Sequence, residues 1–238
     1  MISSRIMISI TDLQKTYDQE TVLQIDELTI PQGESFGLVG NNGAGKTTLF
    51  QLVLDLIRAT KGQVFIENED VSTTEDWKQH VGAYLDKYML LTYLTPDEYF
   101  ETLRKIYGLS DEDLSIHLEK FTDLFNGEII GTGKYIRDLS KGNLKKVGIA
   151  SAMLGDKNIV LLDEPFENLD PTSQNRLKKI ITEEKEQNQV TYLISSHDLV
   201  HVTNVCDRIV LLEKGIIKKD LKAEKEEMTS ELNEYFNV

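Results

Sequence analysis

The stretch "ESFGLVGNNGAGKTTLFQLVLDLI", from Glu34 to Ile57, combines three patterns in one segment. Residues 34–40 form an apolar run that breaks into glycine, which is typical of a buried β-strand. Residues 45–57 predict a helix. Between the two, "GNNGAGKTT" fits the pattern G-x-x-x-x-G-K-[ST]. The glycine-rich loop therefore follows a strand and precedes a helix, which is the context that phosphate binding requires.

The loop comprises nine residues: Gly40, Asn41, Asn42, Gly43, Ala44, Gly45, Lys46, Thr47 and Thr48. Glycines let the backbone wrap a phosphate chain with its N–H groups pointing inward, and the following helix N-terminus adds partial positive charge. Lys46 is expected to reach the β and γ phosphates of a nucleotide, and Thr47 to present its hydroxyl to Mg²⁺. The alternative is a glycine-rich turn that matches the pattern by chance, which the strand and helix context disfavours.

A second motif, the acidic segment "NIVLLDEP", supplies the carboxylates that a nucleotide triphosphatase needs. Asp163 is expected to bind the metal ion and its water shell, and Glu164 is expected to polarise an attacking water. Two adjacent carboxylates after an apolar strand are costly unless a cation or water receives them. The competing interpretation is a strand that simply ends in a polar turn before Pro165. The presence of the phosphate loop disfavours that interpretation.

The rest of the chain places these motifs in a larger pattern. Alternating residues in 5–10 and 21–30 and in "GQVFIENED" (62–70) predict half-buried strands, and "VGAYL" (81–85), "VTYLIS" (190–195) and "RIVLLE" (208–213) are further strand candidates. Residues 95–108 and 110–125 predict helices capped at Thr95 and Ser110. This order indicates an α/β core with a helical insertion.

Composition limits the class of protein. The chain of 238 residues has 40 acidic and 26 basic side chains, a formal net charge of -14, which disfavours nucleic acid as a partner. The single cysteine, Cys206, excludes an internal disulfide and is expected to be buried. The sequence contains no apolar run of about 18 to 20 residues and no pattern of a signal peptide, so a cytosolic chain is expected.

With these motifs in hand, the chain resembles the ATP-binding cassette (ABC) family, that is, the nucleotide-binding subunit of an ABC transporter. The resemblance covers residues 8–219 and rests on ordered motifs: "GNNGAGKTT", "LSKGN", "LLDEP", "ENLDP" and "SSHD". It implies a P-loop NTPase core with an antiparallel β edge and an inserted helical subdomain. The expected boundaries are 1–220 for this domain, with the helical subdomain at about 87–155, and 221–238 for an acidic tail.

The resemblance also implies roles for single residues. Tyr17 matches the aromatic residue that stacks on adenine, and Val22 would line the same pocket. His197 in "ISSHD" matches the switch histidine that reaches the γ-phosphate and attacking water. Asp170 in "ENLDP" matches the loop that passes between subunits. A tyrosine flanking a turn and a structural histidine are the ordinary alternatives.

The family signature, usually Leu-Ser-Gly-Gly-Gln, corresponds here to "LSKGN". Its residues Ser140, Lys141, Gly142 and Asn143 are implied to cover the γ-phosphate held by a partner subunit, so that two cassettes sandwich two ATP molecules. Donors near the start of a helix suit an incoming anion. Lys141 replaces a glycine, which is harmless only if its φ is negative. Variants with Ser-Lys-Gly resemble drug and peptide exporters of the bacitracin-resistance type.

Asp86 is the second departure, because the family normally has glutamine at this hinge. We expect it still to approach the metal when ATP closes the dimer, and a solvated strand-end carboxylate is the alternative. Residues 88–94 are dense in apolar side chains, and in the family this region receives a short helix of the permease. Packing inside the chain would explain the same side chains.

The predicted function is thus the ATPase subunit of a transporter, with export as the expected direction. Expected partners are ATP, Mg²⁺, a second copy of the chain or a homologous cassette, and a permease on a separate chain, so that the subunit would lie at the inner face of the cell membrane. A cassette ATPase working in translation, DNA maintenance or cofactor assembly is the alternative. A non-hydrolysing regulatory subunit is disfavoured because Lys46, Asp163, Glu164 and His197 are all present.

Overall fold

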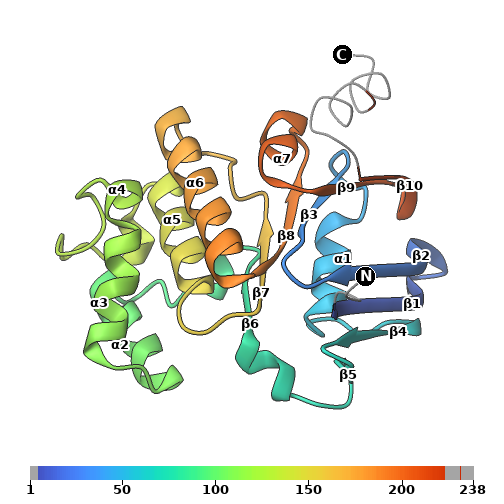
Figure 1. Ribbon diagram of the computed structural model, residues 1–238, viewed down its shortest axis with the longest axis horizontal. Helices are drawn as coiled ribbons and strands as arrows, with labels where there is room; N and C mark the ends of the chain where they lie inside the picture. Colours follow the sequence, from blue (N-terminus) through green and yellow to red (C-terminus); the bar gives the residue numbers. More distant parts are fainter. Residues whose placement is uncertain (1–4, 223–230, 232–238) are drawn as a thin grey trace.

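The computed structural model describes residues 5–222 and residue 231, and these contain a 10-stranded sheet flanked by helices (Figure 1). The strands are β1 (Ile6–Tyr17), β2 (Glu20–Pro31), β3 (Ser35–Val39), β4 (Lys61–Ile66), β5 (Glu69–Asp70), β6 (Val81–Tyr84), β7 (Ile159–Asp163), β8 (Thr191–Ser196), β9 (Arg208–Glu213) and β10 (Ile216–Leu221). The α-helices are α1 (Lys46–Val53), α2 (Pro96–Tyr107), α3 (Asp111–Lys120), α4 (Thr122–Phe125), α5 (Lys141–Ala152), α6 (Pro171–Asn188) and α7 (Leu199–Val205). Short 3-10 turns occupy Asp76–His80, Lys87–Met89 and Ile136–Asp138.

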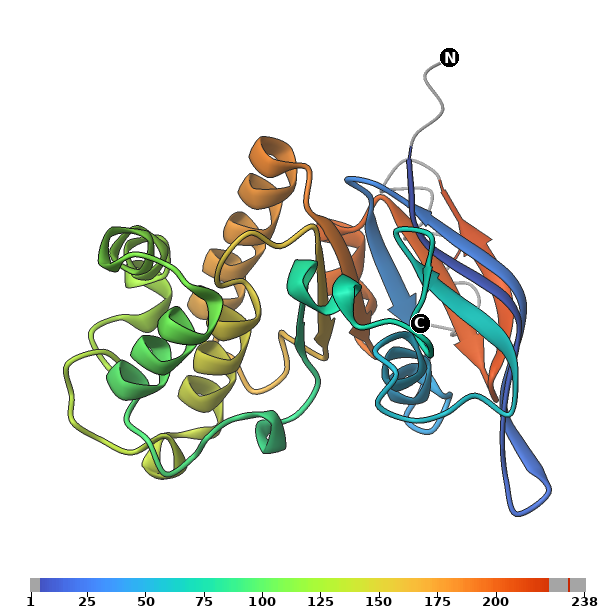
Figure 2. The same ribbon diagram turned by 90° about the horizontal axis from the view of Figure 1, so that it is seen from below.

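The sheet has a parallel and an antiparallel section. Its strand order is β5-β4-β1-β2-β10-β9-β3-β8-β7-β6, with parallel pairing from β9 through β3, β8 and β7 to β6. Strands β1, β2, β4 and β5 pair antiparallel at the other edge. Figure 2 shows this antiparallel edge at one end of the molecule and helices α2 to α4 at the other. The α/β core with an antiparallel edge and a helical portion is therefore confirmed.

The parallel strands are buried on both faces. In β7, Ile159 and Leu161 face the cluster that contains α1, while Val160 and Leu162 face the cluster that contains α5 and α6. A strand covered on both faces has no polar side, so its sequence reads as a continuous apolar run. This is the reason that "NIVLLD" was recognisable as a strand of the parallel type.

The middle of the chain is helical, as its sequence predicts. Thr95 and Ser110 each form a capping box at the start of α2 and α3. The single helix expected over residues 110–125 is interrupted at Phe121, whose φ of -95° and ψ of 0° separate α3 from the short α4. Phe121 is fully buried, and its packing position overrides the helical periodicity. The subdomain boundary at 87–155 stays a prediction, and most of the 221–238 tail lies outside the described residues.

Two expectations about burial and membrane spans can be compared with the structure. Cys206 is 1% exposed, so the expectation that it is buried is confirmed. Within the described ranges, none of the helices has the length and apolar character that crossing a membrane demands.

Candidate functional site

The candidate site lies where three parallel strands end. Strand β8 lies between β3 and β7, with Val39 opposite Ser196 and Asp163 opposite Ser195. Because the carboxyl ends of parallel strands meet at one edge of a sheet, the loops that follow β3, β7 and β8 converge there. The glycine-rich loop and the segments beginning at Asp163 and His197 are thereby brought together from distant parts of the chain.

The glycine-rich loop borders a cavity of about 330 Å³. Gly45, with a φ of 105°, adopts a left-handed conformation immediately before α1, which only glycine takes without strain. The lining consists of Tyr17, Val22, Asn41, Asn42, Gly43, Ala44, Gly45, Lys46, Thr47, Thr48, Asp163 and Glu164. The structure thus brings together in one cavity the loop residues 41–48, the paired carboxylates and the two residues expected beside the nucleobase. Gly40, the remaining loop residue, contacts Lys46.

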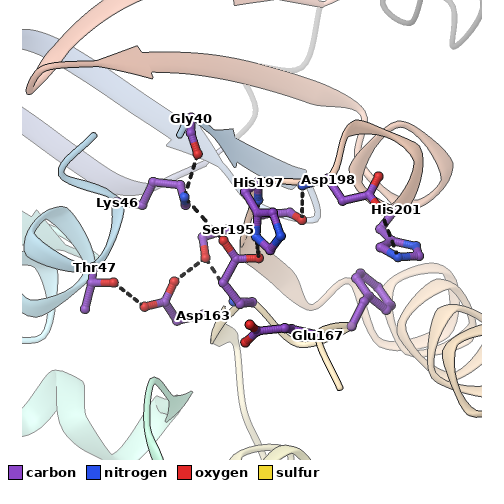
Figure 3. Close-up of polar contacts among 12 residues, drawn as sticks. Gly40, Lys46, Thr47, Asp163, Glu167, Ser195, His197, Asp198 and His201 are labelled. Atoms are coloured by element: carbon purple, nitrogen blue, oxygen red, sulfur yellow. Dashed lines mark hydrogen bonds and ion pairs between the residues drawn. The ribbon is translucent and has the colours of Figure 1, made fainter. Parts of the chain in front are cut away.

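Lys46, Glu164 and His197 are linked in one chain of polar contacts (Figure 3). Lys46 is 6% exposed, and its Nζ donates to the Gly40 carbonyl oxygen at 2.6 Å and lies 3.3 Å from Glu164 Oε1. This oxygen has no hydrogen-bond partner within the described residues, so its ion pair with Lys46 is its only polar contact there. Glu164 Oε2 lies 3.0 Å from His197 Nδ1 and accepts the His197 N–H at 3.2 Å.

Asp163 is held by two hydroxyl groups. Thr47 Oγ1 donates to Asp163 Oδ2 at 2.5 Å, and Ser195 Oγ donates to Asp163 Oδ1. Burial raises the pKa of Asp163 above its ordinary value, and the hydrogen bonds from Ser195 and Thr47 oppose that shift. The hydrogen bond between Thr47 and Asp163 joins the phosphate loop to the acidic motif "NIVLLDEP".

Ser195 and Lys145 contact the site, and the sequence interpretation assigned a role to neither. Ser195 Oγ accepts the N–H of Glu164 at 3.0 Å, and Lys145 Nζ donates to the Glu164 carbonyl oxygen at 2.6 Å. Burial lowers the pKa of Lys145 below its ordinary value, although nearby carboxylates oppose the shift. Ser195 stands in "ISSHD" and Lys145 lies two residues after "LSKGN", but only the fold shows that they meet Glu164.

Tyr17, at the end of β1, and Val22, near the start of β2, line the same cavity. The Tyr17 side chain is 47% exposed, and the ammonium group of Lys15 lies 4.5 Å from the centre of its ring. A half-exposed aromatic ring beside the phosphate loop is suited to stacking on a flat base. Its role in nucleotide binding stays a prediction.

The signature residues border a different cavity, of about 660 Å³. Ser140 is the N-cap of α5 and accepts the Asn143 N–H at 3.2 Å, while the Asn143 side chain donates to Glu128. Lys141 lies in the helix without positive φ, so the condition for replacing glycine by lysine is met. A Cβ on Gly142 would lie 2.9 Å from the carbonyl oxygen of Asn168, which explains a glycine at that position.

Asp170 lines the same cavity as the signature and is the N-cap of α6. Its carboxylate accepts hydrogen bonds from the N–H of Ser173 at 3.0 Å and from the Ser173 hydroxyl at 2.5 Å. These bonds hold the pKa of Asp170 below its usual range. The two loops expected to face a partner subunit therefore lie side by side, separate from the cavity of the phosphate loop.

Asp86 borders a third cavity, of about 270 Å³, which Asp163 and Glu164 also line. In this structure the Asp86 carboxylate caps the turn that follows β6 by accepting the Tyr88 N–H at 2.9 Å. Beyond it, Tyr88 is 85% exposed and Tyr93 61% exposed, whereas Leu90 is buried. Asp86 is thus near the acidic pair but hydrogen-bonded locally, and its approach to a metal stays a prediction.

Comparisons with known proteins agree with these motifs. The family model described as "ABC transporter" matches residues 23–167. An uncharacterized ABC transporter ATP-binding protein of Nostoc sp. is 35% identical over 218 residues, covering 86% of this chain and 63% of the relative. A second uncharacterized one, of Synechocystis sp., is 34% identical over 189 residues, covering 79% and 53%. The ABC transporter ATP-binding protein NatA of Bacillus subtilis is 31% identical over 215 residues, covering 88% and 87%.

Solved structures share the fold. The structure of an ATP-binding subunit of an ABC transporter has a TM-score of 0.83 at 25% identity, covering 95% of this chain and 99% of that one. A dimeric post-hydrolysis ATP-binding cassette bound to ADP and Pi has a TM-score of 0.80 at 23% identity, covering 91% and 98%. The chain thus spans nearly the whole of these two structures, but 53% of the relative from Synechocystis sp. and 63% of the relative from Nostoc sp..

Proposed function

The chain belongs to the ABC transporter family as an ATP-binding subunit, and from this premise we propose that it hydrolyses ATP to drive a separate membrane permease. The observation that carries the proposal is the linked set of Lys46, Glu164 and His197 at the end of the parallel strands. A cation for phosphate, a carboxylate for water and an imidazole beside it are the groups that phosphoryl transfer to water requires.

The triphosphate would bind along the glycine-rich loop. Lys46 would exchange its contacts with Gly40 and Glu164 for phosphate oxygens, since it is the loop's one cation and is nearly buried. Backbone N–H groups at the start of α1 complete a positive cradle. Tyr17 and Val22 at the rim of the same cavity would take the adenine ring.

The residues present fit Mg²⁺. The Thr47 hydroxyl and the Asp163 carboxylate lie 2.5 Å apart, and oxygen donors of this kind are what Mg²⁺ takes in proteins. Thr47 would hold the ion together with phosphate oxygens, with Asp163 beside them, and Asp86 is the proposed further carboxylate in the closed dimer. When bound, the ion neutralises charge on the β and γ phosphates.

Glu164 is the proposed general base. Among the described residues its Oε1 has a polar contact with Lys46 alone, so that oxygen becomes available to a water when Lys46 turns to phosphate. Its Oε2 stays oriented by the backbone and the ring of His197. His197 would in turn contact the γ-phosphate, which keeps the base and the phosphate in register.

A second copy of the chain, or a homologous cassette, would complete each site. Ser140, Lys141, Gly142, Asn143 and Asp170 gather in a cavity that shares no lining residue with the cavity of the phosphate loop. This separation supports docking head to tail, in which the signature of one subunit covers the nucleotide of the other. The exposed Tyr88 and Tyr93 are the proposed contacts of the permease, at the inner face of the membrane.

The proposed direction of transport is export, as the resemblance of "LSKGN" to cassettes of the bacitracin-resistance type favours. Matching relatives also include proteins named for the import of Fe(3+) ions and of methionine. Direction is therefore tested separately, by following solute movement in vesicles that contain the chain together with its permease. Accumulation on the side of the cassette would contradict export.

The proposed activity is tested by phosphate release from ATP and Mg²⁺ on the purified chain. Lys46→Ala should lower turnover about 100-fold or more, because a buried cation at the transferred phosphate is lost. The matched control is Lys61→Ala, at an exposed position that begins β4 away from the cavity. Equal turnover by Lys46→Ala and the unaltered chain would refute hydrolysis at this site.

A further inference from the structure

The backbone of Glu164 is held on both sides by side chains from other elements. Its N–H donates to Ser195 Oγ on β8 at 3.0 Å. Its carbonyl oxygen accepts from Lys145 Nζ on α5 at 2.6 Å and from the Glu167 N–H at 3.2 Å. Glu164 has a φ of 48°, a left-handed conformation that a non-glycine residue keeps only when its surroundings impose it.

We propose that Ser195 and Lys145 are positioning residues that together fix the Glu164 backbone and so aim its carboxylate at the attacking water. The inference rests on the proposed function of Glu164 and goes beyond it. Neither side chain reaches the cavity of the phosphate loop, whose lining includes Glu164 but not Ser195 or Lys145. Lys145 is therefore connected to the reaction through the Glu164 backbone, and Ser195 through both Glu164 and Asp163.

Ser195 suits this role because of its burial and its two bonds. It is 0% exposed, and its single hydroxyl donates to Asp163 while it accepts the N–H of Glu164. An apolar residue of similar size would leave that N–H without its partner in a buried setting, a state that proteins avoid. The hydroxyl thus ties two consecutive acidic residues to the neighbouring strand.

Lys145 supplies the other half of the restraint. Its ammonium group is drawn to the Glu164 carbonyl oxygen and lies 3.5 Å from the Glu167 carboxylate. The side chain of Lys145 is only 12% exposed, so it cannot swing into solvent without leaving these partners. It reaches Glu164 from α5, the helix that Ser140 caps. The signature helix and the proposed base are thereby in direct contact within one chain.

The test uses Ser195→Ala and Lys145→Met in the full chain. Each should lower kcat for ATP about 10-fold or more while KM changes less than about two-fold, since misplacing a reacting group slows chemistry without weakening nucleotide binding. In single-turnover assays, adding Lys145→Met to Glu164→Gln should cause no further loss, because the positioned carboxylate is already absent.

Two control variants match the burial but not the contacts. Ser35→Ala removes a hydroxyl that is also 0% exposed, and Lys157→Met removes a buried lysine whose Nζ donates to Gln79. Ser35 begins β3 and Lys157 precedes β7, so both lie at the ends of these strands opposite to the site, and both variants should keep kcat within about two-fold. Unchanged kcat in Ser195→Ala and Lys145→Met would overturn the proposal, and so would a loss in Lys145→Met that adds to that of Glu164→Gln.

A measurement independent of turnover separates this inference from the proposed function. Ser195→Ala should speed hydrogen exchange of the Glu164 amide, and Ser35→Ala should not, because only Ser195 accepts that N–H. An unaltered chain that fails to hydrolyse ATP would contradict the proposed function, whereas unchanged amide exchange would contradict the role of Ser195. The two failures are therefore distinguishable.

Discussion

His117 shows how one residue acquires a property that its sequence neighbours do not reveal. It lies in α3, a helix rich in acidic residues that are mostly exposed, yet His117 itself is only 6% exposed. Its Nε2–H donates to the Ala150 carbonyl oxygen at 2.9 Å, and its ring centre lies 5.0 Å from that of Phe121. Burial lowers the pKa of His117 to about 4, so the ring is neutral in the folded chain.

Stability should consequently fall on acidification. Above the unfolded pKa of 6.5 both states carry a neutral ring; between 6.5 and about 4 only the unfolded state binds the proton, so folding loses stability as pH falls. From pH 7.5 to 5.0 this one group should cost about 2 kcal/mol. Urea unfolding at both pH values should show that loss, and His117→Gln should show less of it.

The exposed His80 provides the comparison for this experiment. His80→Gln should lose as much stability between the two pH values as the unaltered chain. If His117→Gln and His80→Gln behave alike, burial of His117 is not the source of the acid sensitivity.

At the scale of elements, strand β6 and helix α5 approach so closely that side-chain size is limiting. Gly82 lies on β6, and a Cβ there would overlap the carbonyl oxygen of Ala152 at the end of α5. A Cβ added to Gly148, on α5, would likewise overlap the ring of Tyr84 on β6. Because a backbone atom cannot move without its helix, the contact between these two elements depends on glycine.

Gly82→Ala should therefore lower the free energy of unfolding by about 3 kcal/mol through overpacking. Urea unfolding of both chains measures this difference in the free energy of unfolding. The control is Gly133→Ala, where φ is 68° but an added Cβ meets nothing within 4 Å, so only backbone strain of about 1 kcal/mol is expected. A larger loss in Gly133→Ala than in Gly82→Ala would mean that strain, not crowding, controls these glycines.

At the scale of the whole molecule, the two candidate ATP-contacting surfaces lie apart. The cavities of about 330 Å³ at the phosphate loop and about 660 Å³ at the signature have no lining residue in common. A nucleotide on the loop would therefore be left open until another subunit approaches. The net charge of -14 per chain opposes that approach at long range, so the nucleotide and its local contacts must outweigh it.

Glu164→Gln should bind ATP without turnover and elute as a dimer in the presence of ATP and Mg²⁺, because the nucleotide that joins the subunits is no longer cleaved. Size-exclusion chromatography with light scattering measures the mass. Adding Lys46→Ala should return the monomer by removing nucleotide binding. A Glu164→Gln chain that binds ATP and remains monomeric would refute the sandwich.

The sequence by itself determined the local parts of this protein. The strand, loop and helix around Lys46, the apolar strand before Asp163 and the caps at Thr95 and Ser110 are each encoded by neighbouring residues. Local periodicity and capping chemistry need no distant contact, so they can be predicted from a window of sequence. The order of the motifs then sufficed to indicate the family.

Only the tertiary structure decided which distant residues meet. The break at Phe121, the buried imidazole of His117 and the contacts of Ser195 and Lys145 with Glu164 all depend on packing between elements far apart in the chain. A serine or lysine in or beside a sequence motif has many possible partners, and the sheet order and helix placement select one. The carboxylate of Glu164 is aimed by that selection, which no single stretch of sequence contains.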